Sequence, residues 1–265
     1  MSRSFMKQND GRAGIWVRSG QKLARRLVLT MPRFMQDGLR VLYNSDANLE
    51  FCLRQLQAKG FAPGLVVDCG AYRGNWTRMI KKIFPGARVL MVEAQADKEP
   101  LLAQVCSEFP GTVDYVRCLL GAEPREAATF FEMESGSSVL EELTDVPRRA
   151  VTLRMVPLDD LLRERKIAGE TLLKLDVQGY ELEVLKGAKE AMASAEVILL
   201  EVSLVRYNQS APIFHEVVEF MKERGFLVYD ICPLPRWADT TLFQADVLFV
   251  KKDSVFRQIN FPGEK

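Results

Sequence analysis

The segment LVVDCGAYRGN, residues 65–75, indicates how this chain folds. A short apolar run ends in Asp68, two glycines follow four residues apart, and a helical pattern begins at Trp76. This order is typical of a buried parallel strand, a tight turn and a helix N-terminus, where α/β sheets bind their ligands. Gly70 and Gly74 permit positive φ angles and a close approach of the backbone to a ligand.

The acid at the end of this run indicates which ligand the turn accepts. A dinucleotide-binding turn reads G-x-G-x-x-G and receives an anionic pyrophosphate, but Asp68 stands where its first glycine would be. A carboxylate repels pyrophosphate and attracts a cation such as the ammonium group of S-adenosylmethionine. The carboxylate of that cofactor would then meet backbone N–H groups near the helix start. On this motif alone, a purely structural turn is the alternative.

The composition, with 48% apolar and 27% charged residues, is that of a soluble globular protein. The net charge of +1 gives no reason to expect a nucleic-acid partner, but residues 1–60 carry eleven lysines and arginines against four acids. This basic arm is either a solvated helical face or a contact for an anionic membrane. The five cysteines form no C-x-x-C pair, which indicates reduced thiols and a cytoplasmic location. No apolar run is long enough for a transmembrane helix.

Strands and helices alternate from about residue 61 to residue 253, which indicates a parallel, doubly wound sheet. The expected parallel strands are 65–68, 88–93, 112–120, 172–177 and 196–202. The expected helices between them include 74–84, 97–109, 158–166, 180–192 and 212–224. Extra strands are expected near 127–133 and 151–156, and an antiparallel pair at 226–231 and 246–251.

Acids at three strand ends form the candidate site. Glu93 follows Asp68 by 25 residues, near the position where an acid holds a ribose diol. The carboxyl ends of neighbouring parallel strands open on one crevice, so Asp176 and Glu201 should lie on the acceptor side. They could act as a general base, bind a divalent cation such as Mg²⁺, or position the acceptor. Helix capping, or an ion pair with Lys174 or Lys186, is the structural alternative.

Two further positions complete the candidate set. His215, the only histidine, lies on an amphipathic helix and is a candidate general base, with packing or exposure as the alternative. Ser137 and Ser138 lie in a glycine-containing loop that either closes over the cofactor or forms a plain hairpin tip.

The chain resembles the FkbM-type family of S-adenosylmethionine-dependent methyltransferases. The resemblance covers about residues 60–252 and rests on four segments: VDCGAYRGN at 67–75, VEA at 92–94, VPLDDLL at 156–162 and LKLDVQGYELEVLKGA at 173–188. The family usually reads K-x-D-v-E-G-x-E-x-x-v-L-x-G-A in the last segment. Gln178 therefore stands where glutamate is commoner.

The resemblance implies a class I methyltransferase fold: a Rossmann-like, doubly wound, mostly parallel seven-stranded sheet with an antiparallel last strand, here with an N-terminal helical extension. It also implies that Asp176 faces the active site, and that the usual reaction is O-methylation of sugars or other hydroxylated natural products. The candidate cofactor-binding residues are Asp68, Cys69, Gly70, Ala71, Tyr72, Gly74, Asn75, Glu93, Ala94 and Ser138. The candidate catalytic residues are Asp176, Glu201 and His215, the first two being also the candidate metal ligands.

We therefore expect a basic arm at 1–60, a methyltransferase domain at 61–253 and a tail at 254–265. The expected function is S-adenosylmethionine-dependent O-methylation of a saccharide, a glycosylated molecule or a secondary metabolite. A homodimer is a further expectation. A dehydrogenase is disfavoured by Asp68, and a non-catalytic nucleoside- or sugar-binding protein that keeps the fold is the alternative.

Overall fold

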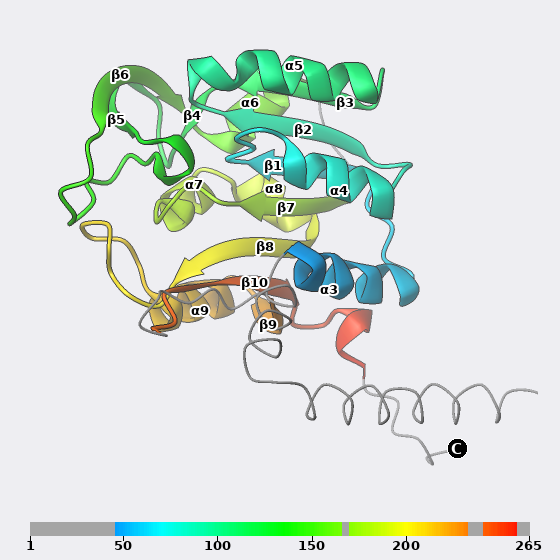
Figure 1. Ribbon diagram of the computed structural model, residues 1–265. Helices are drawn as coiled ribbons and strands as arrows, with labels where there is room; N and C mark the ends of the chain where they lie inside the picture. Colours follow the sequence, from blue (N-terminus) through cyan, green and yellow to red (C-terminus); the bar gives the residue numbers. More distant parts are fainter. Residues whose placement is uncertain (1–45, 166–169, 233–240, 259–265) are drawn as a thin grey trace, which may run out of the picture. The chain divides into compact units, whose positions relative to one another are not determined.

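The central sheet of the protein has seven strands. They are β1 (Leu65–Cys69), β2 (Arg88–Glu93), β3 (Val113–Arg117), β7 (Thr171–Leu175), β8 (Ala195–Ser203), β9 (Phe226–Cys232) and β10 (Gln244–Lys251). The computed structural model describes residues 46–165, 170–232 and 241–258. The strand order is β3-β2-β1-β7-β8-β10-β9 (Figure 1). Pairing is parallel from β3 to β8, and β10 is antiparallel to both its neighbours, which confirms the expected fold class.

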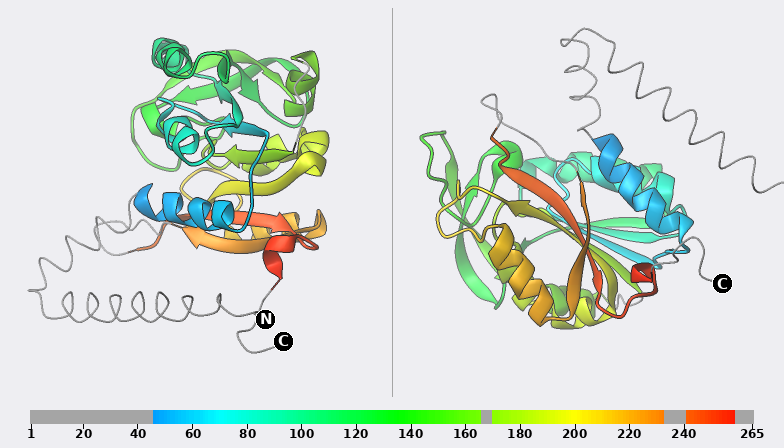
Figure 2. Two further views of the ribbon diagram at one scale, coloured as in Figure 1. Left: turned by 90° about the vertical axis from the view of Figure 1, so that its right-hand side faces the viewer. Right: turned by 90° about the horizontal axis from the view of Figure 1, so that it is seen from below.

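Helices cover both faces of this sheet, as the right-hand view of Figure 2 shows. The α-helices are α3 (Asp46–Ala58), α4 (Asn75–Ile83), α5 (Glu99–Glu108), α6 (Leu158–Glu164), α7 (Glu181–Lys186), α8 (Lys189–Ser194) and α9 (Phe214–Glu223). The 3₁₀ turns are η1 (Ala96–Lys98), η2 (Glu134–Gly136) and η3 (Val255–Arg257). Helices α3 to α5 share one apolar core, and α6 to α9 share the other. Strand β1 alternates between the two cores, Val66 facing the first and Val67 the second, which explains its continuous apolar run.

A second, smaller sheet interrupts the alternation and differs from the expected layout. It contains β4 (Leu119–Leu120), β5 (Arg125–Glu132) and β6 (Arg149–Val156), in the order β4-β6-β5. The expected strand 112–120 is therefore two strands in two sheets. Cys118 N–H donates to the carbonyl of Glu93, the last residue of β2, and the chain then pairs with β6. Figure 1 shows the small sheet beside the carboxyl ends of the central strands.

The expected helix 180–192 is also divided, into α7 and α8. Gly187 lies at the break, packed so closely that a Cβ there would come within 2.3 Å of the Gly121 carbonyl oxygen. The Asp159 carboxylate accepts the N–H groups of Glu190 and Ala191 at 2.9 Å each and so caps the start of α8.

The packed unit is larger than the expected 61–253. Leu53 and Leu56 of α3 are fully buried in the core that contains Val66 of β1. Phe256 of η3 is buried in the same core. Contacts divide the chain after Ala47. Residues 1–45 of the predicted basic arm and residues 259–265 of the predicted tail lie outside the described residues. None of the described helices is both long and apolar enough to cross a membrane.

Candidate functional site

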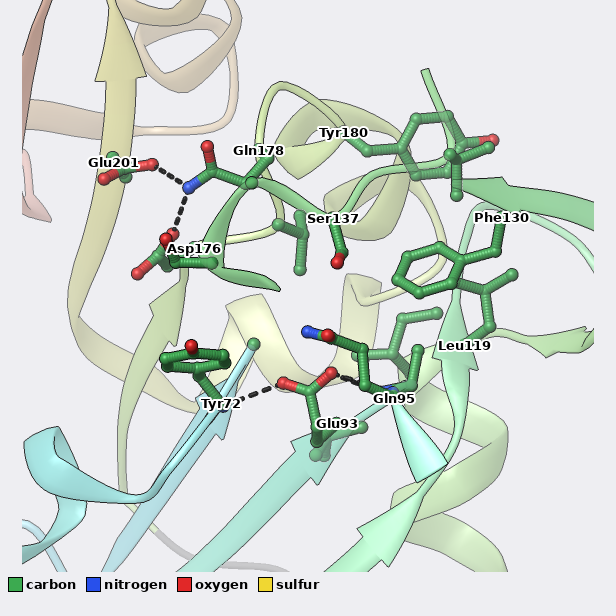
Figure 3. Close-up of a pocket in the computed structure, with 18 of the residues that line it drawn as sticks. Tyr72, Glu93, Gln95, Leu119, Phe130, Ser137, Asp176, Gln178, Tyr180 and Glu201 are labelled. Carbon is green, nitrogen blue, oxygen red and sulfur yellow. Dashed lines mark hydrogen bonds between the residues drawn. The ribbon is translucent and has the colours of Figure 1, made fainter. Parts of the chain in front are cut away.

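A cavity opens at the carboxyl ends of β1, β2, β7 and β8 (Figure 3). The cavity has a volume of about 290 Å³, which is at the lower end of the volumes of small-molecule pockets. The small sheet supplies an apolar wall that includes Leu119, Leu120 and Phe130. Glu93, Asp176 and Glu201 supply the carboxylates. The acids at the ends of β2 and β8, and the acid one residue beyond β7, thus face one cavity, as the topology predicts.

Glu93 is held by the backbone at one side of this cavity. Its carboxylate accepts three N–H groups, from Tyr72 at 2.8 Å, Ala94 at 2.8 Å and Gln95 at 2.9 Å. Burial raises the pKa of Glu93 above its ordinary value, although these hydrogen bonds favour the charged form. A carboxylate has about four lone-pair positions, so about one remains for a ligand hydroxyl.

Asp68 does not line the cavity, and its predicted contact with the cofactor ammonium group is corrected. Its side chain is fully buried. It accepts the Thr77 hydroxyl at 2.8 Å, and the Lys174 ammonium lies 3.1 Å from its other oxygen. Asp68 lies on the same side of β1 as Val66, toward α4, which carries Thr77. The acid at the end of β1 is therefore a structural partner of Lys174.

Lys174 joins the turns after β1 and β7. Its ammonium lies 3.1 Å from the Gly70 carbonyl oxygen, 3.1 Å from the Asp68 carboxylate and 3.3 Å from the Asp176 carboxylate. One of these contacts is a hydrogen bond, to the Gly70 carbonyl, and the other two are ion pairs. Burial works against its charged form, but the two carboxylates outweigh burial and raise the pKa of Lys174. The sequence indicated Lys174 only as an ion-pair partner for the acids of this region.

Asp176 and Glu201 are bridged by an amide. Gln178 Nε2 lies 2.9 Å from Asp176 Oδ1 and 2.5 Å from Glu201 Oε2 (Figure 3). The Gln244 amide donates to the other oxygen of Glu201. Burial, and then the charge of Asp176, raise the pKa of Glu201 well above its ordinary value. The two acids are therefore adjacent, and Glu201 holds its proton more tightly than an exposed glutamate does.

The remaining predicted cofactor residues divide into two groups. Gly70, Tyr72 and Ala94 line the cavity. Those that do not line it are Cys69, Ala71, Gly74, Asn75 and Ser138. Gly74 instead permits close packing on α5, because a Cβ there would lie 2.6 Å from Val105. Ser138 is buried, and its hydroxyl donates to the Gln178 carbonyl oxygen at 2.9 Å.

His215 lies outside the cavity, so its candidate role as a general base is corrected. It is exposed on α9 and does not line the cavity. Helix α9 buries Val217, Phe220 and Met221, and His215 lies on the outward side of this amphipathic pattern.

In the part of the chain that the structure describes, no third carboxylate or imidazole joins Asp176 and Glu201 in a group that could hold a metal ion. Among the described residues, one group of three His, Cys, Asp or Glu side chains is close enough to share a metal ion, and it is Cys52, Asp230 and Cys232. None of these lines the cavity. The described partners of Asp176 and Glu201 are the amides of Gln178 and Gln244 and the ammonium of Lys174, which are donors, so the metal-ligand role remains a prediction without structural support.

The loop at 133–138 closes on the turn after β1. Glu134 accepts the Tyr72 hydroxyl at 2.6 Å and the Lys98 ammonium at 2.9 Å. These contacts, the Tyr72 hydrogen bond first, lower the pKa of Glu134 to about 2. Ser137 lines the cavity, and its hydroxyl donates to the Glu134 carbonyl oxygen at 2.9 Å. The backbone groups of Phe131 and Ser138 pair with each other across the loop, so it forms a hairpin tip whose Ser137 lines the cavity, and its closure over a cofactor stays a prediction.

Several lining residues were not singled out from the sequence. Gln95, Leu119, Phe130, Tyr180 and Gln244 line the cavity. Tyr180 lies within the quoted family segment and Gln95 follows the VEA segment, so position in a motif was a usable signal for both. Leu119, Phe130 and Gln244 lie in ordinary apolar or polar runs that carry no such signal.

Comparison with known proteins places these motifs in a family. The profile of the methyltransferase FkbM domain matches residues 68–228. The hexuronic acid methyltransferase AglP of Haloferax volcanii is 22% identical over 149 residues, which are 54% of this chain and 61% of that protein.

Solved structures with a similar fold include two methyltransferases. The 1,6-didemethyltoxoflavin-N1-methyltransferase of Burkholderia thailandensis has a TM-score of 0.44 and 14% identity, with 95% of this chain and 94% of that chain covered. The magnesium protoporphyrin IX methyltransferase of Synechocystis PCC 6803 has a TM-score of 0.45 and 12% identity, with 83% and 85% covered. Since the domain profile matches more than half of the chain, from the turn of Asp68 into β9, the chain belongs to the FkbM methyltransferase family.

Proposed function

We propose that this protein transfers a methyl group from S-adenosylmethionine to a hydroxyl of a saccharide or another glycosylated or hydroxylated acceptor. The observation that carries the proposal is the single cavity that joins Glu93 at one side to the Asp176–Glu201 pair at the other. Membership of the methyltransferase family supports it.

The residues of the cavity suit the parts of this cofactor. The remaining lone pair of Glu93 fits a ribose hydroxyl, and Leu119 and Phe130 offer an apolar wall for the base. The Asp68 carboxylate is buried against Lys174 and does not line the cavity. Asp176, which lies beside the turn of Gly70, is a carboxylate that does. The Asp176 carboxylate, which lies 3.3 Å from the Lys174 ammonium, would attract the ammonium group of the cofactor.

Glu201 is the better placed acid for proton removal. When bound, S-adenosylmethionine supplies a methyl carbon that the acceptor oxygen attacks in line, while its sulfur leaves with the bonding electron pair. Glu201 would take the proton of the acceptor hydroxyl. Burial and the charge of Asp176 raise the pKa of Glu201, which makes its carboxylate a stronger base than an exposed one.

The acid pair favours an uncharged acceptor. A carboxylate-bearing acceptor would approach Asp176 and Glu201, where burial and the charge of Asp176 already disfavour a second negative charge. A hydroxyl has a proton to give and meets no such repulsion. The chain spans about 61% of the length of AglP, so the hexuronic acid of that name is a substrate class to test and is not carried over.

Calorimetric titration of the full chain with S-adenosylhomocysteine tests the cofactor. We expect binding in the micromolar range and none with NAD. Glu93→Gln keeps the size of the side chain but cannot accept all three N–H groups and a hydroxyl equally well, so it should bind at least about tenfold more weakly. Equal affinity for both proteins would remove Glu93 from the site.

Transfer of a labelled methyl group tests the acceptor. We expect label on neutral hexose glycosides, little on the matching hexuronates, and loss of at least about a hundredfold in rate for Glu201→Gln. Tight cofactor binding without transfer to any hydroxylated acceptor would favour the non-catalytic alternative.

A further inference from the structure

The Gln178 side chain is a double donor between two acids. Its Nε2 group carries two hydrogens, and the group lies 2.9 Å from Asp176 Oδ1 and 2.5 Å from Glu201 Oε2. Its Oε1 accepts the Tyr207 hydroxyl at 3.2 Å. All hydrogens of the amide are therefore used, and the amide oxygen points away from both carboxylates, as Figure 3 shows.

The opposite orientation of the amide is the one that a metal ion would require. It would place the amide oxygen beside Asp176 and Glu201, making three acceptors with no donor among them. Mg²⁺, Mn²⁺ and similar ions bind such oxygen sets. In the observed orientation the hydrogens of Gln178 take the lone pairs that the ion would need.

The backbone holds Gln178 in this place. Gln178 has φ +55° and Gly179 has φ +91°, a left-handed turn that is costly for a residue with a side chain. The Gln178 carbonyl oxygen accepts the Ser138 hydroxyl at 2.9 Å and the Asn208 amide at 2.7 Å. A Cβ on Gly179 would lie 2.8 Å from the Cβ of Ala211, so the segment around Ala211 packs directly against the turn.

The acid that follows the turn closes it from inside. Glu181 is buried and accepts the N–H groups of Val177 at 3.0 Å and Gly179 at 3.1 Å with one oxygen. The turn that presents Gln178 is thus bonded by side chains of three other segments and by its own helix. Such a fixed arrangement is what pre-organised sites require.

We infer that the Gln178 amide holds Asp176 and Glu201 together in place of a divalent cation, so that this site neither binds nor needs one. The inference rests on the proposed function for the role of the two acids. The metal-ligand role considered for Asp176 and Glu201 accordingly does not fit this chain. Glutamate, which is commoner at position 178 in the family, would remove the two donors and add a third carboxylate.

Manganese binding tests the inference without an acceptor substrate. The full chain would be titrated with Mn²⁺ at neutral pH, the free ion being followed by its electron paramagnetic resonance signal. We expect no saturable site in the micromolar range for the wild type. Gln178→Glu should gain one site per chain, and Gln178→Glu combined with Asp176→Asn should lose it. Gln95→Glu adds the same charge elsewhere in the cavity and should gain none.

Two results would overturn the inference. One is a wild-type protein that binds one Mn²⁺ and loses it on Asp176→Asn. The other is a folded Gln178→Glu protein that gains no site, with Gln178→Asp as the second variant if the first fails to fold. Titration of the wild type with S-adenosylhomocysteine tests the proposed function separately. If the protein does not bind S-adenosylhomocysteine but shows the expected Mn²⁺ pattern, the proposed function is wrong and the inference about the Gln178 amide stands.

Discussion

At the scale of single residues, the buried ammonium of Lys174 neutralises acids from two turns. It lies among Asp68, Asp176 and the Gly70 carbonyl oxygen, and it is almost fully buried. Lys174→Met leaves the fully buried Asp68 carboxylate without its cation, which typically costs about 3–5 kcal/mol. We expect that loss in urea unfolding. Asp68→Asn added to Lys174→Met should recover part of the loss, because the uncompensated charge is gone. Additive losses in the double variant would show that the pair is not coupled.

Glu181 gives the protein a specific pH dependence. Burial raises its pKa to about 7, from an ordinary value of 4.5. The folded state therefore holds this proton more tightly than the unfolded state, so its contribution to stability is fully present below pH 4.5 and is lost as the pH rises to about 7. Glu181→Gln removes this loss and keeps an oxygen for Val177 and Gly179. The free energy of unfolding of the variant relative to wild type, measured by urea unfolding, should rise between pH 4.5 and 7 by an amount on the order of 3 kcal/mol, and then level.

Glu183→Gln is the matched control for this pH series. Glu183 lies on the same helix but contacts only Lys186 at the surface. We expect its effect to stay within about 0.5 kcal/mol at every pH. A Glu181→Gln difference that is equally flat would mean that Glu181 is ionised over the whole range.

The residue scale also shows where sequence reasoning stopped. Glu93, Asp176 and Glu201 were predictable because the carboxyl ends of parallel strands open on one crevice. The direction of Asp68 was not, since every residue of β1 is buried and no alternation of polar and apolar residues marks the two faces. The Gln178 bridge depends on a left-handed turn that only the folded chain shows.

At the scale of elements, the loop at 133–138 should control how fast the cofactor leaves. Glu134→Gln weakens the contacts to Tyr72 and Lys98 that hold the loop on the turn after β1. We expect S-adenosylhomocysteine to dissociate a few-fold faster, with less change in its association rate, because most interface changes act on dissociation. Stopped-flow measurement checks both rates. Glu132→Gln, which breaks only an outer pair with Arg149, should leave both unchanged.

A strand was predictable from the sequence where one run of apolar residues pairs with the same neighbouring strands along its whole length. Strand β2 was placed to the residue, whereas the apolar segment that ends at Leu120 was predicted as one strand and forms two. The reason is that one residue, Cys118, separates β3 from β4 in the sequence, and the division between them comes from the change of partner from β2 to β6. Periodicity reports burial and does not report the partner.

At the scale of the whole molecule, the extent of the packed core predicts which terminal residues can be deleted without loss of folding. Because α3 is part of the core, a chain that starts at residue 46 should melt within a few degrees of the full chain and bind S-adenosylhomocysteine equally well. Co-sedimentation of both chains with anionic vesicles then tests the membrane contact considered for the basic arm. Loss of folding in the shorter chain would show that residues 1–45 belong to the folded unit.

The two turns that Lys174 joins are not independent in their response to ligands. If the Gly70 carbonyl shifts toward a bound cofactor, the Lys174 ammonium that contacts it shifts as well, and this changes the ion pair between Lys174 and Asp176. Binding at either place therefore changes the free energy of binding at the other by the same amount, since linkage is reciprocal. Cofactor and acceptor should consequently show cooperativity in a ternary titration, and that cooperativity should vanish in Lys174→Met.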